Sequence, residues 1–177
     1  MPVDKYTVLD KNMTKEELSN LERAPLYFVL DNIRSAFNVG SAFRTADAGS
    51  IAQICICGIS AYPPNRKLAK TALGATDSVP WKYYDTTTEA IKDLKSQGIN
   101  ICIVELTSRS ENFWEHSFSK PTALVFGHEV TGVSEEALEL ADHFVHIPMH
   151  GKKSTLNVAT SVGVVMFEVL RQWNGPK

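Results

Sequence analysis

The chain has 177 residues, of which 44% are hydrophobic and 21% charged, and its formal net charge is −2. This length suits one domain with a substantial core and is short for two. No apolar run reaches the roughly 18 residues of a membrane helix, and the N-terminus lacks the apolar stretch of a secretory signal. We therefore expect a single globular domain, residues 1–177, in the cytoplasm and without a membrane anchor.

The three cysteines, Cys55, Cys57 and Cys102, lie in strand-like apolar runs. Their odd number and their context differ from the paired cysteines of disulfide or zinc frameworks. Cys55 and Cys57 would share one face of a single strand, which is poor geometry for a tetrahedral metal site. We expect buried, reduced thiols and no bound metal.

The charges are unevenly distributed along the chain. Residues 1–72 and 149–177 are mildly basic, and residues 73–148 between them are acidic. Basic ends are compatible with a surface that faces a polyanion, although charged side chains more often serve only to solvate a surface.

The first elements follow from capping and apolar patterns. Thr14 and Glu17 form a capping box, which predicts a short helix to about residue 21 within an N-terminal extension, residues 1–24. Residues 26–30 are an apolar run typical of a buried strand. After a polar loop, Asn38 is expected to cap a helix that ends near residue 48.

The rest of the chain alternates strands with helices. Strands are predicted at residues 51–59, 79–84, 99–105, 123–126 and 144–147. Helices are predicted at residues 66–73 and 88–96, and two more begin at residues 134 and 158. Residues 107–120 are predicted to form a loop with one helical turn at 111–114. This alternation predicts an α/β fold, with a mostly parallel sheet and helices on both faces.

The last helix is apolar on almost every side, which favours two buried flanks. One flank would pack on the sheet. The other would meet a second copy of the protein, unless this is an ordinary C-terminal core helix.

Ligands of such sheets bind beyond the carboxyl ends of the strands. Three polar clusters are predicted there, at residues 32–44, 127–132 and 149–157. The chain has neither a GxGxxG nor a GxxxxGK[ST] sequence, so a nucleotide-like ligand would be held in some other way.

Single residues in these clusters leave alternatives open. Arg44 is either a solvated arginine or a phosphate clamp. Glu129 is either a surface carboxylate or the partner of an arginine such as Arg34 or Arg44. His128 and the other C-terminal histidines have no nucleophile partner that would indicate a hydrolase.

Taken together, the three clusters resemble the motifs of the SpoU–TrmH branch of the SPOUT superfamily of RNA methyltransferases. The matching segments are NVGSAFRTADA (38–48), LVFGHEVTG (124–132) and IPMHGKKSTLNV (147–158). Their order and spacing make the joint match specific, and it extends over about residues 26–173.

The resemblance implies a deep C-terminal trefoil knot, an obligate homodimer and S-adenosylmethionine as the cofactor. It places the adenosine pocket at Val104, Gly127, Ile147, Met149 and Leu156. The implied reaction is methyl transfer to a ribose 2′-hydroxyl of RNA, in tRNA more than in rRNA.

The resemblance also implies catalytic roles for Arg44, Asn38, Glu129, Asn157 and Thr155. A guanidinium stays protonated up to a pH above about 12, so a phosphate clamp suits Arg44 better than a general base. Thr155 stands where the family usually has serine and keeps the hydroxyl. RNA would bind to the dimer surface through basic side chains: Arg34, Arg66, Lys67, Lys70, Lys152 and Lys153.

Two other functions compete with this one. The first is a non-catalytic dimeric RNA-binding protein on the same scaffold, which Thr155 and the acidic middle of the chain favour. The second is a small-molecule enzyme with an ordinary open α/β fold, which would need a pocket motif that the sequence lacks.

Overall fold

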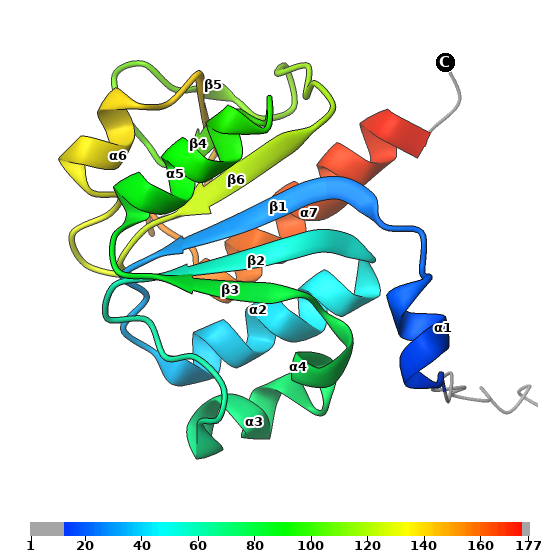
Figure 1. Ribbon diagram of the computed structural model, residues 1–177. Helices are drawn as coiled ribbons and strands as arrows, with labels where there is room; N and C mark the ends of the chain where they lie inside the picture. Colours follow the sequence, from blue (N-terminus) through cyan, green and yellow to red (C-terminus); the bar gives the residue numbers. More distant parts are fainter. Residues whose placement is uncertain (1–12, 175–177) are drawn as a thin grey trace, which may run out of the picture.

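A computed structural model of the protein describes residues 13–174, and Figure 1 shows its ribbon. Seven strands form one sheet in the order β3-β2-β1-β6-β4-β7-β5. Every pair of neighbouring strands in this sheet is parallel. Helices cover both faces, so the predicted α/β architecture is confirmed.

The bounds of the elements agree closely with the predicted alternation. The strands are β1 (Ala24–Asp31), β2 (Ile51–Cys57), β3 (Trp81–Tyr84), β4 (Asn100–Val104), β5 (Glu111–Asn112), β6 (Thr122–Phe126) and β7 (His143–His146). The helices are α1 (Lys15–Ser19), α2 (Ala36–Ala48), α3 (Arg66–Ala72), α4 (Ala75–Ser78), α5 (Thr87–Ser96), α6 (Glu135–Glu139) and α7 (Val158–Asn174).

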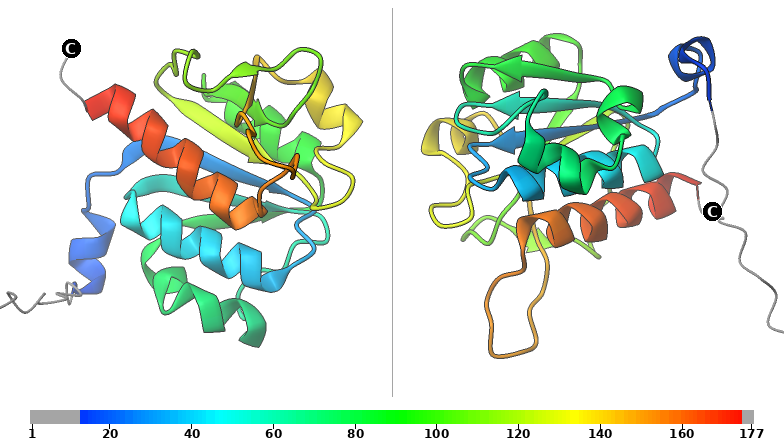
Figure 2. Two further views of the ribbon diagram at one scale, coloured as in Figure 1. Left: turned by 180° about the vertical axis from the view of Figure 1, so that it is seen from behind. Right: turned by 90° about the horizontal axis from the view of Figure 1, so that it is seen from below.

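Side chains that alternate along the strands divide the core into two halves. Phe28 and Ile54 belong to the half under α2 and α7, where Phe28 meets Phe126 edge to face. Val29 and Cys55 belong to the half under α5 and α6. Figure 2 shows α7 lying along α2 on the first face. Both faces of the central strands are therefore buried, which explains their continuous apolar runs.

The cysteines are free and buried, as predicted. Burial raises the pKa of the Cys55 thiol to about 12, and it raises that of Cys102 to about 12 as well. Both thiols stay protonated at neutral pH and serve as small apolar core groups.

The register of β1 with β6 positions the loops that follow both strands. Leu30 pairs with Phe126 near the carboxyl ends of the two strands. The segments after them, 32–35 and 127–132, therefore leave the sheet side by side. Two of the three predicted polar clusters meet at this point.

The prediction that Asn38 caps α2 is wrong. Ser35 is the cap: it has an extended backbone, and its hydroxyl accepts the N–H of Asn38 at 3.4 Å. The helix begins three residues earlier than predicted because a serine hydroxyl at this position satisfies one of the free N–H groups of the first turn. Asn38 lies in that first turn, and its amide is available for other contacts.

The helical turn predicted at residues 111–114 is displaced: residues 113–115 form the turn, in which the N–H of Glu115 donates to the carbonyl oxygen of Asn112 at 2.9 Å. Glu111–Asn112 is the edge strand β5, which pairs with Val145 and His146 of β7. A strand of two residues forms because its neighbour has an unpaired edge, and two residues are too few to show a strand pattern in the sequence. The short helix α4 was not predicted either.

Some expectations stay predictions. Over the described residues the structure does not show the trefoil knot, and nothing in it tests the division into one domain with an extension. The capping box of Thr14 and Glu17 is present at α1, and residues 1–12 lie outside the described part. No helix between residues 13 and 174 combines the length and apolarity needed to cross a membrane.

A close helix contact gives the first testable prediction. A Cβ on Gly40 of α2 would lie 2.2 Å from the carbonyl oxygen of Leu68 in α3. We expect Gly40→Ala to force the helices apart and to lower the free energy of unfolding by about 1–3 kcal/mol in urea denaturation.

Gly163→Ala is the matched control within α7. The nearest atom to its added Cβ is the Cγ2 of Thr45 at 3.9 Å, an ordinary contact. Alanine is the better helix former, so this variant should be unchanged or more stable by up to about 1 kcal/mol. Equal unfolding midpoints for both variants, at one protein concentration, would contradict the packing argument.

Candidate active site

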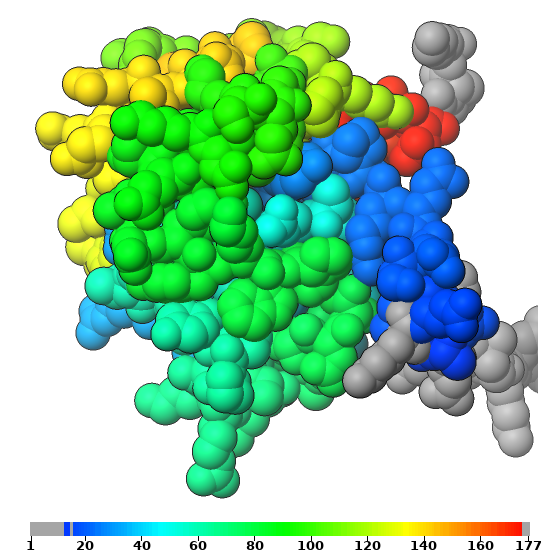
Figure 3. All heavy atoms as spheres, viewed as in Figure 1, coloured from blue at the N-terminus to red at the C-terminus, as the bar shows by residue number. Residues whose placement is uncertain are grey.

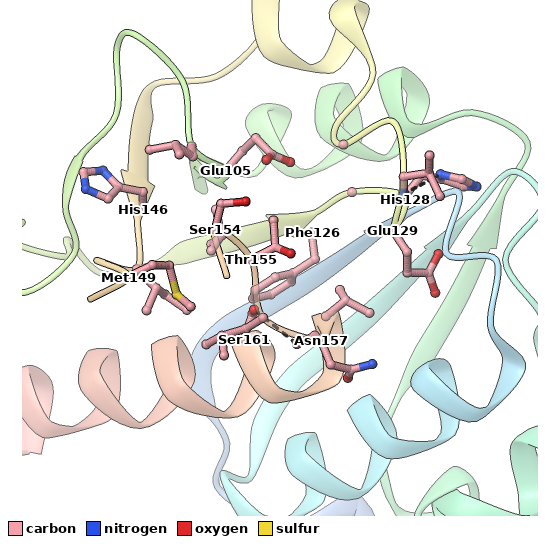
Figure 4. Close-up of a pocket in the computed structure, with 18 residues that line it drawn as sticks. Glu105, Phe126, His128, Glu129, His146, Met149, Ser154, Thr155, Asn157 and Ser161 are labelled. Atoms are coloured by element: carbon pink, nitrogen blue, oxygen red, sulfur yellow. Dashed lines mark hydrogen bonds between the residues drawn. The ribbon is translucent and has the colours of Figure 1, made fainter. Parts of the chain in front are cut away.

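A pocket of about 440 Å³ opens at the carboxyl ends of β4, β6 and β7. Figure 4 shows the side chains that surround it. All five positions predicted to hold the cofactor line it: Val104, Gly127, Ile147, Met149 and Leu156. Three of the five predicted catalytic residues line it as well, namely Glu129, Thr155 and Asn157. Segments far apart in the sequence thus form one site.

The loop from Gly127 to Gly132 forms one wall and is folded tightly on itself. The backbones of His128 and Gly132 exchange two hydrogen bonds, of 3.0 and 2.9 Å. The ring Nδ1 of His128 accepts the N–H groups of Val130 and Thr131 at 3.1 and 3.3 Å. A Cβ on Gly127 would lie 2.2 Å from the nitrogen of Val133, so only glycine fits there. His128 therefore shapes the wall, and its ring is occupied by local contacts.

The opposite wall, residues 147–156, is different. Within the part of the chain that the structure describes, no hydrogen bond involves any group of this segment. In Figure 2 the segment stands away from the body of the protein as a long loop before α7. Residues 150–156 are exposed, so water satisfies their backbone N–H and C=O groups until a ligand replaces it. This segment therefore offers main-chain groups to a ligand beside the apolar side chains of Ile147 and Leu156.

Asn38 connects the two walls. Its Nδ2 donates to Oε1 of Glu129 at 2.9 Å, and its Oδ1 accepts from Nδ2 of Asn157 at 3.2 Å. The Oδ1 of Asn157 in turn accepts the N–H of Ala159 at 2.9 Å, at the start of α7. These bonds join residues separated by 91 and 119 positions in the sequence.

Glu129 also accepts two backbone N–H groups, from Arg34 at 2.9 Å and from Ser35 at 3.1 Å. It therefore binds the main chain of Arg34, and not a guanidinium as one interpretation of the sequence had it. Burial acts to raise the pKa of the Glu129 carboxyl, but hydrogen bonds from its own backbone, Asn38, Arg34 and Ser35 outweigh burial and lower the pKa. The carboxylate is ionised at neutral pH.

Arg44 lies outside the pocket lining. It is exposed on α2, six residues or roughly 9 Å along the helix from Asn38. Among the described residues, its guanidinium has neither an ion pair nor a hydrogen bond. The structure thus gathers Asn38, Glu129, Thr155 and Asn157 and leaves Arg44 on the adjoining surface. Their catalytic roles stay predictions.

Asp31, at the end of β1, escaped the sequence analysis. Its side chain is 1% exposed. It accepts the N–H and hydroxyl of Ser134 at 2.7 and 2.9 Å, the amide of Asn32 at 2.8 Å and the hydroxyl of Thr87. A buried carboxylate needs such partners. The bonds to Ser134 fix the chain just after the loop 127–132. The sequence did carry a signal for this role, because Asp31 is an aspartate at the end of an apolar strand.

The remaining lining residues were also missed. They include Glu105, Phe126, His146 and Ser161. Glu105 is the last residue of the predicted strand 99–105, so the rule that sites lie at carboxyl ends would have identified it. Among the described residues, no group of three or more His, Cys, Asp or Glu side chains is placed to hold a metal ion.

The parallel sheet with a pocket beyond its carboxyl edge places the protein among the α/β proteins whose ligands bind at that edge. The model of the SpoU rRNA Methylase family matches residues 25–167, and the chain belongs to this family.

One relative is the tRNA (guanosine(18)-2'-O)-methyltransferase of Aquifex aeolicus, which is 32% identical over 96% of this chain and 81% of its own length. The chain spans 62% of the length of the enzyme of the same name from Escherichia coli.

Solved structures agree with this assignment. The TrmH/SpoU tRNA modifying enzyme of A. aeolicus matches with a TM-score of 0.77 and 28% identity, over 89% of this chain and 83% of that one. The SpoU methyltransferase AviRb of Streptomyces viridochromogenes, in complex with AdoMet, has a TM-score of 0.80 and covers 89% of this chain and 61% of that one. At 24% identity, the second likeness concerns the fold alone.

The carboxylate of Glu129 gives a pH-dependent prediction. Glu129→Gln should lower the free energy of unfolding at pH 7 by about 1 kcal/mol, a value reduced for the exposure of the side chain. Because the folded pKa lies below the ordinary 4.5, this stabilisation is complete above that pH and is lost as the pH falls through the lowered pKa.

Urea denaturation of both proteins at pH 7 and at several values below 4.5 checks this. The difference between wild type and variant should shrink toward zero in acid. A difference that stays constant, or grows as the pH falls, would show that the carboxylate charge is not what holds the loop.

Proposed function

We propose that the protein transfers a methyl group from S-adenosylmethionine to a ribose 2′-hydroxyl of RNA, and of tRNA in preference to rRNA. One observation carries the proposal: all five predicted cofactor positions line one pocket beside the linked Glu129, Asn38 and Asn157. The tRNA 2'-O-methyltransferase from A. aeolicus supports the reaction and the substrate class.

The pocket suits the cofactor by the chemistry of its lining. Val104, Phe126 and Ile147 offer apolar surface for an adenine ring. The main chain of residues 147–156 has donors and acceptors without a partner among the described residues, which suits the polar groups of a nucleoside. S-adenosylmethionine, when bound, supplies a methyl group on a sulfonium. Asn38 and Glu129 keep the two walls at a fixed separation, so the site is preorganised for the transfer.

Arg44 is assigned to the RNA. Its guanidinium keeps its charge at any working pH and matches a phosphate in geometry. It is exposed and has no ion pair with any residue between 13 and 174, which leaves it available for a phosphate beside the target ribose. Thr155, which lines the pocket, keeps the hydroxyl of the usual serine. The three buried thiols suit a reducing cytoplasm, where we place the protein.

The test measures tritium transfer from labelled S-adenosylmethionine into tRNA and rRNA that lack native modification. Wild type should label tRNA. Arg44→Ala should lower turnover about 100-fold or more and leave cofactor affinity, measured by calorimetry, within about twofold, because Arg44 lies outside the pocket.

Each other outcome has a clear meaning. RNA binding with neither cofactor binding nor transfer would favour the non-catalytic RNA-binding protein, whereas cofactor binding without transfer would point to a missing partner or a particular RNA assembly. Unchanged turnover in Arg44→Ala would remove Arg44 from the site. Arg44→Lys is the matched control, because it keeps the charge but loses the paired N–H donors of the guanidinium.

The protein is proposed to act as a homodimer. Val162, Val165 and Met166 of α7 are fully buried against the core. On the other flank, Val164 is 38% and Phe167 is 55% exposed, three residues apart on one side of the helix. Exposed apolar side chains on a helix that is otherwise buried favour contact with a second copy.

Phe167→Asp should convert a dimer into a monomer in analytical ultracentrifugation, because it places a charge in the apolar contact. Leu73→Asn is the matched control, since Leu73 is 66% exposed at the end of α3 and far from this flank in sequence. A wild-type monomer, or a Phe167→Asp dimer as tight as wild type, would contradict the proposed interface.

A further inference from the structure

Among the described residues, some lysine and arginine side chains are ion-paired, and others, such as Arg44 and Lys92, are not. Between residues 13 and 174, Lys82, Lys95 and Arg171 form ion pairs with Asp93, Asp142 and Glu168. The cations of α3 are exposed, and in the same part of the chain they have no carboxylate within ion-pair distance. They are Arg66, Lys67 and Lys70. Three neighbouring cations without counter-charges indicate a surface for an anionic partner.

These cations share the outer side of α3. The helix buries Leu68 and Ala72 against α2. Lys70 lies three residues after Lys67 and four after Arg66, so the three side chains are neighbours on the exposed side. Figure 3 shows this part of the chain standing out from the lower surface of the molecule.

The α3 helix is also attached to the helix that carries the site. The hydroxyl of Thr71 donates to the carbonyl oxygen of Phe37 at 2.9 Å. Phe37 precedes Asn38, the residue that bonds Glu129 and Asn157. The two helices follow neighbouring parallel strands, so both begin at the carboxyl edge of the sheet. The α3 helix therefore packs on the helix that carries Asn38, and its basic side faces solvent at the same edge of the sheet as the candidate site.

An exposed aromatic ring lies at the start of this surface. Tyr62, in the loop before α3, packs on Tyr83 with ring centres 4.6 Å apart. The hydroxyl of Tyr83 donates to the carbonyl oxygen of Gly58 at 3.0 Å and so fixes the supporting ring. Tyr62 still has 47% of its surface exposed. Because one face of the Tyr62 ring packs on Tyr83 and part of the ring is exposed, a nucleic-acid base can stack on it.

We propose that Tyr62, Arg66, Lys67 and Lys70 form a docking surface for RNA, named here the α3 surface. The cations bind phosphates, and Tyr62 stacks on an unpaired base beyond the target nucleotide. This inference rests on the proposed function, because it assigns to that site the part of its substrate outside the pocket.

The test measures binding of an unmodified tRNA transcript by fluorescence anisotropy at salt concentrations from 50 to 200 mM. Lys67→Glu combined with Lys70→Glu should weaken binding about tenfold at the lowest salt and make the salt dependence shallower. Tyr62→Ala should weaken binding about tenfold at every salt concentration, whereas Tyr62→Phe should stay within about twofold of wild type.

Lys92→Glu is the matched control, because Lys92 is an exposed lysine on α5, on the opposite face of the sheet. If the α3 variants bind RNA as well as Lys92→Glu does, the α3 surface is not a docking surface. The same conclusion follows if wild type binds no RNA.

Cofactor titration separates this inference from the proposed function. The α3 variants should bind S-adenosylmethionine as wild type does, since none of the four side chains lines the pocket. If wild type binds RNA through the α3 surface but transfers no methyl group, the proposed reaction fails and the docking surface stands. If wild type methylates RNA and the α3 variants do so with unchanged KM, the docking surface fails and the reaction stands.

Discussion

The parallel pairing of β1 with β6 is the constraint on which the site depends. Leu30 and Phe126 are partners in register, so the chain leaves both strands at one level of the sheet. This register brings Glu129 within hydrogen-bond distance of the backbone at Arg34 and Ser35. A shift by one residue would turn the side chains of β6 to the wrong faces and move the Gly127 loop away from α2.

Two carboxylates then fix the loops that the sheet has brought together. Asp31 is buried and holds Ser134, just beyond the Gly127 loop. Glu129 holds the loop itself to the first turn of α2, through Asn38 and two backbone groups. One wall of the pocket is therefore rigid, while residues 147–156 keep their polar main chain for a ligand. This combination suits a cofactor bound mainly by the backbone, and it accounts for the absence of a standard nucleotide motif.

The sequence predicted elements well where local physics decides them. The apolar runs gave the strands, and the capping box of Thr14 was enough to place α1. Prediction from the sequence failed where a residue that is distant in the sequence determines the local structure. Ser35 and Asn38 are both good caps, and the choice between them depends on Glu129, which lies 91 residues from Asn38 and takes its amide. The strand β5 forms because β7 leaves an edge open, and no local pattern can show this.

The sequence by itself determined the α/β class and the buried thiols, because apolar period is a property of the chain alone, and its motifs carried the family resemblance that implied the five cofactor positions. Only the tertiary structure decided that Asn38 bridges Glu129 and Asn157, that Asp31 anchors Ser134, and that Arg44 stands outside the pocket. It also placed α3 against α2, with the cations of α3 on the outer side. The physical reason is that hydrogen bonds and charge pairs act over a few ångströms in space, and which residues come that close depends on strand order and register.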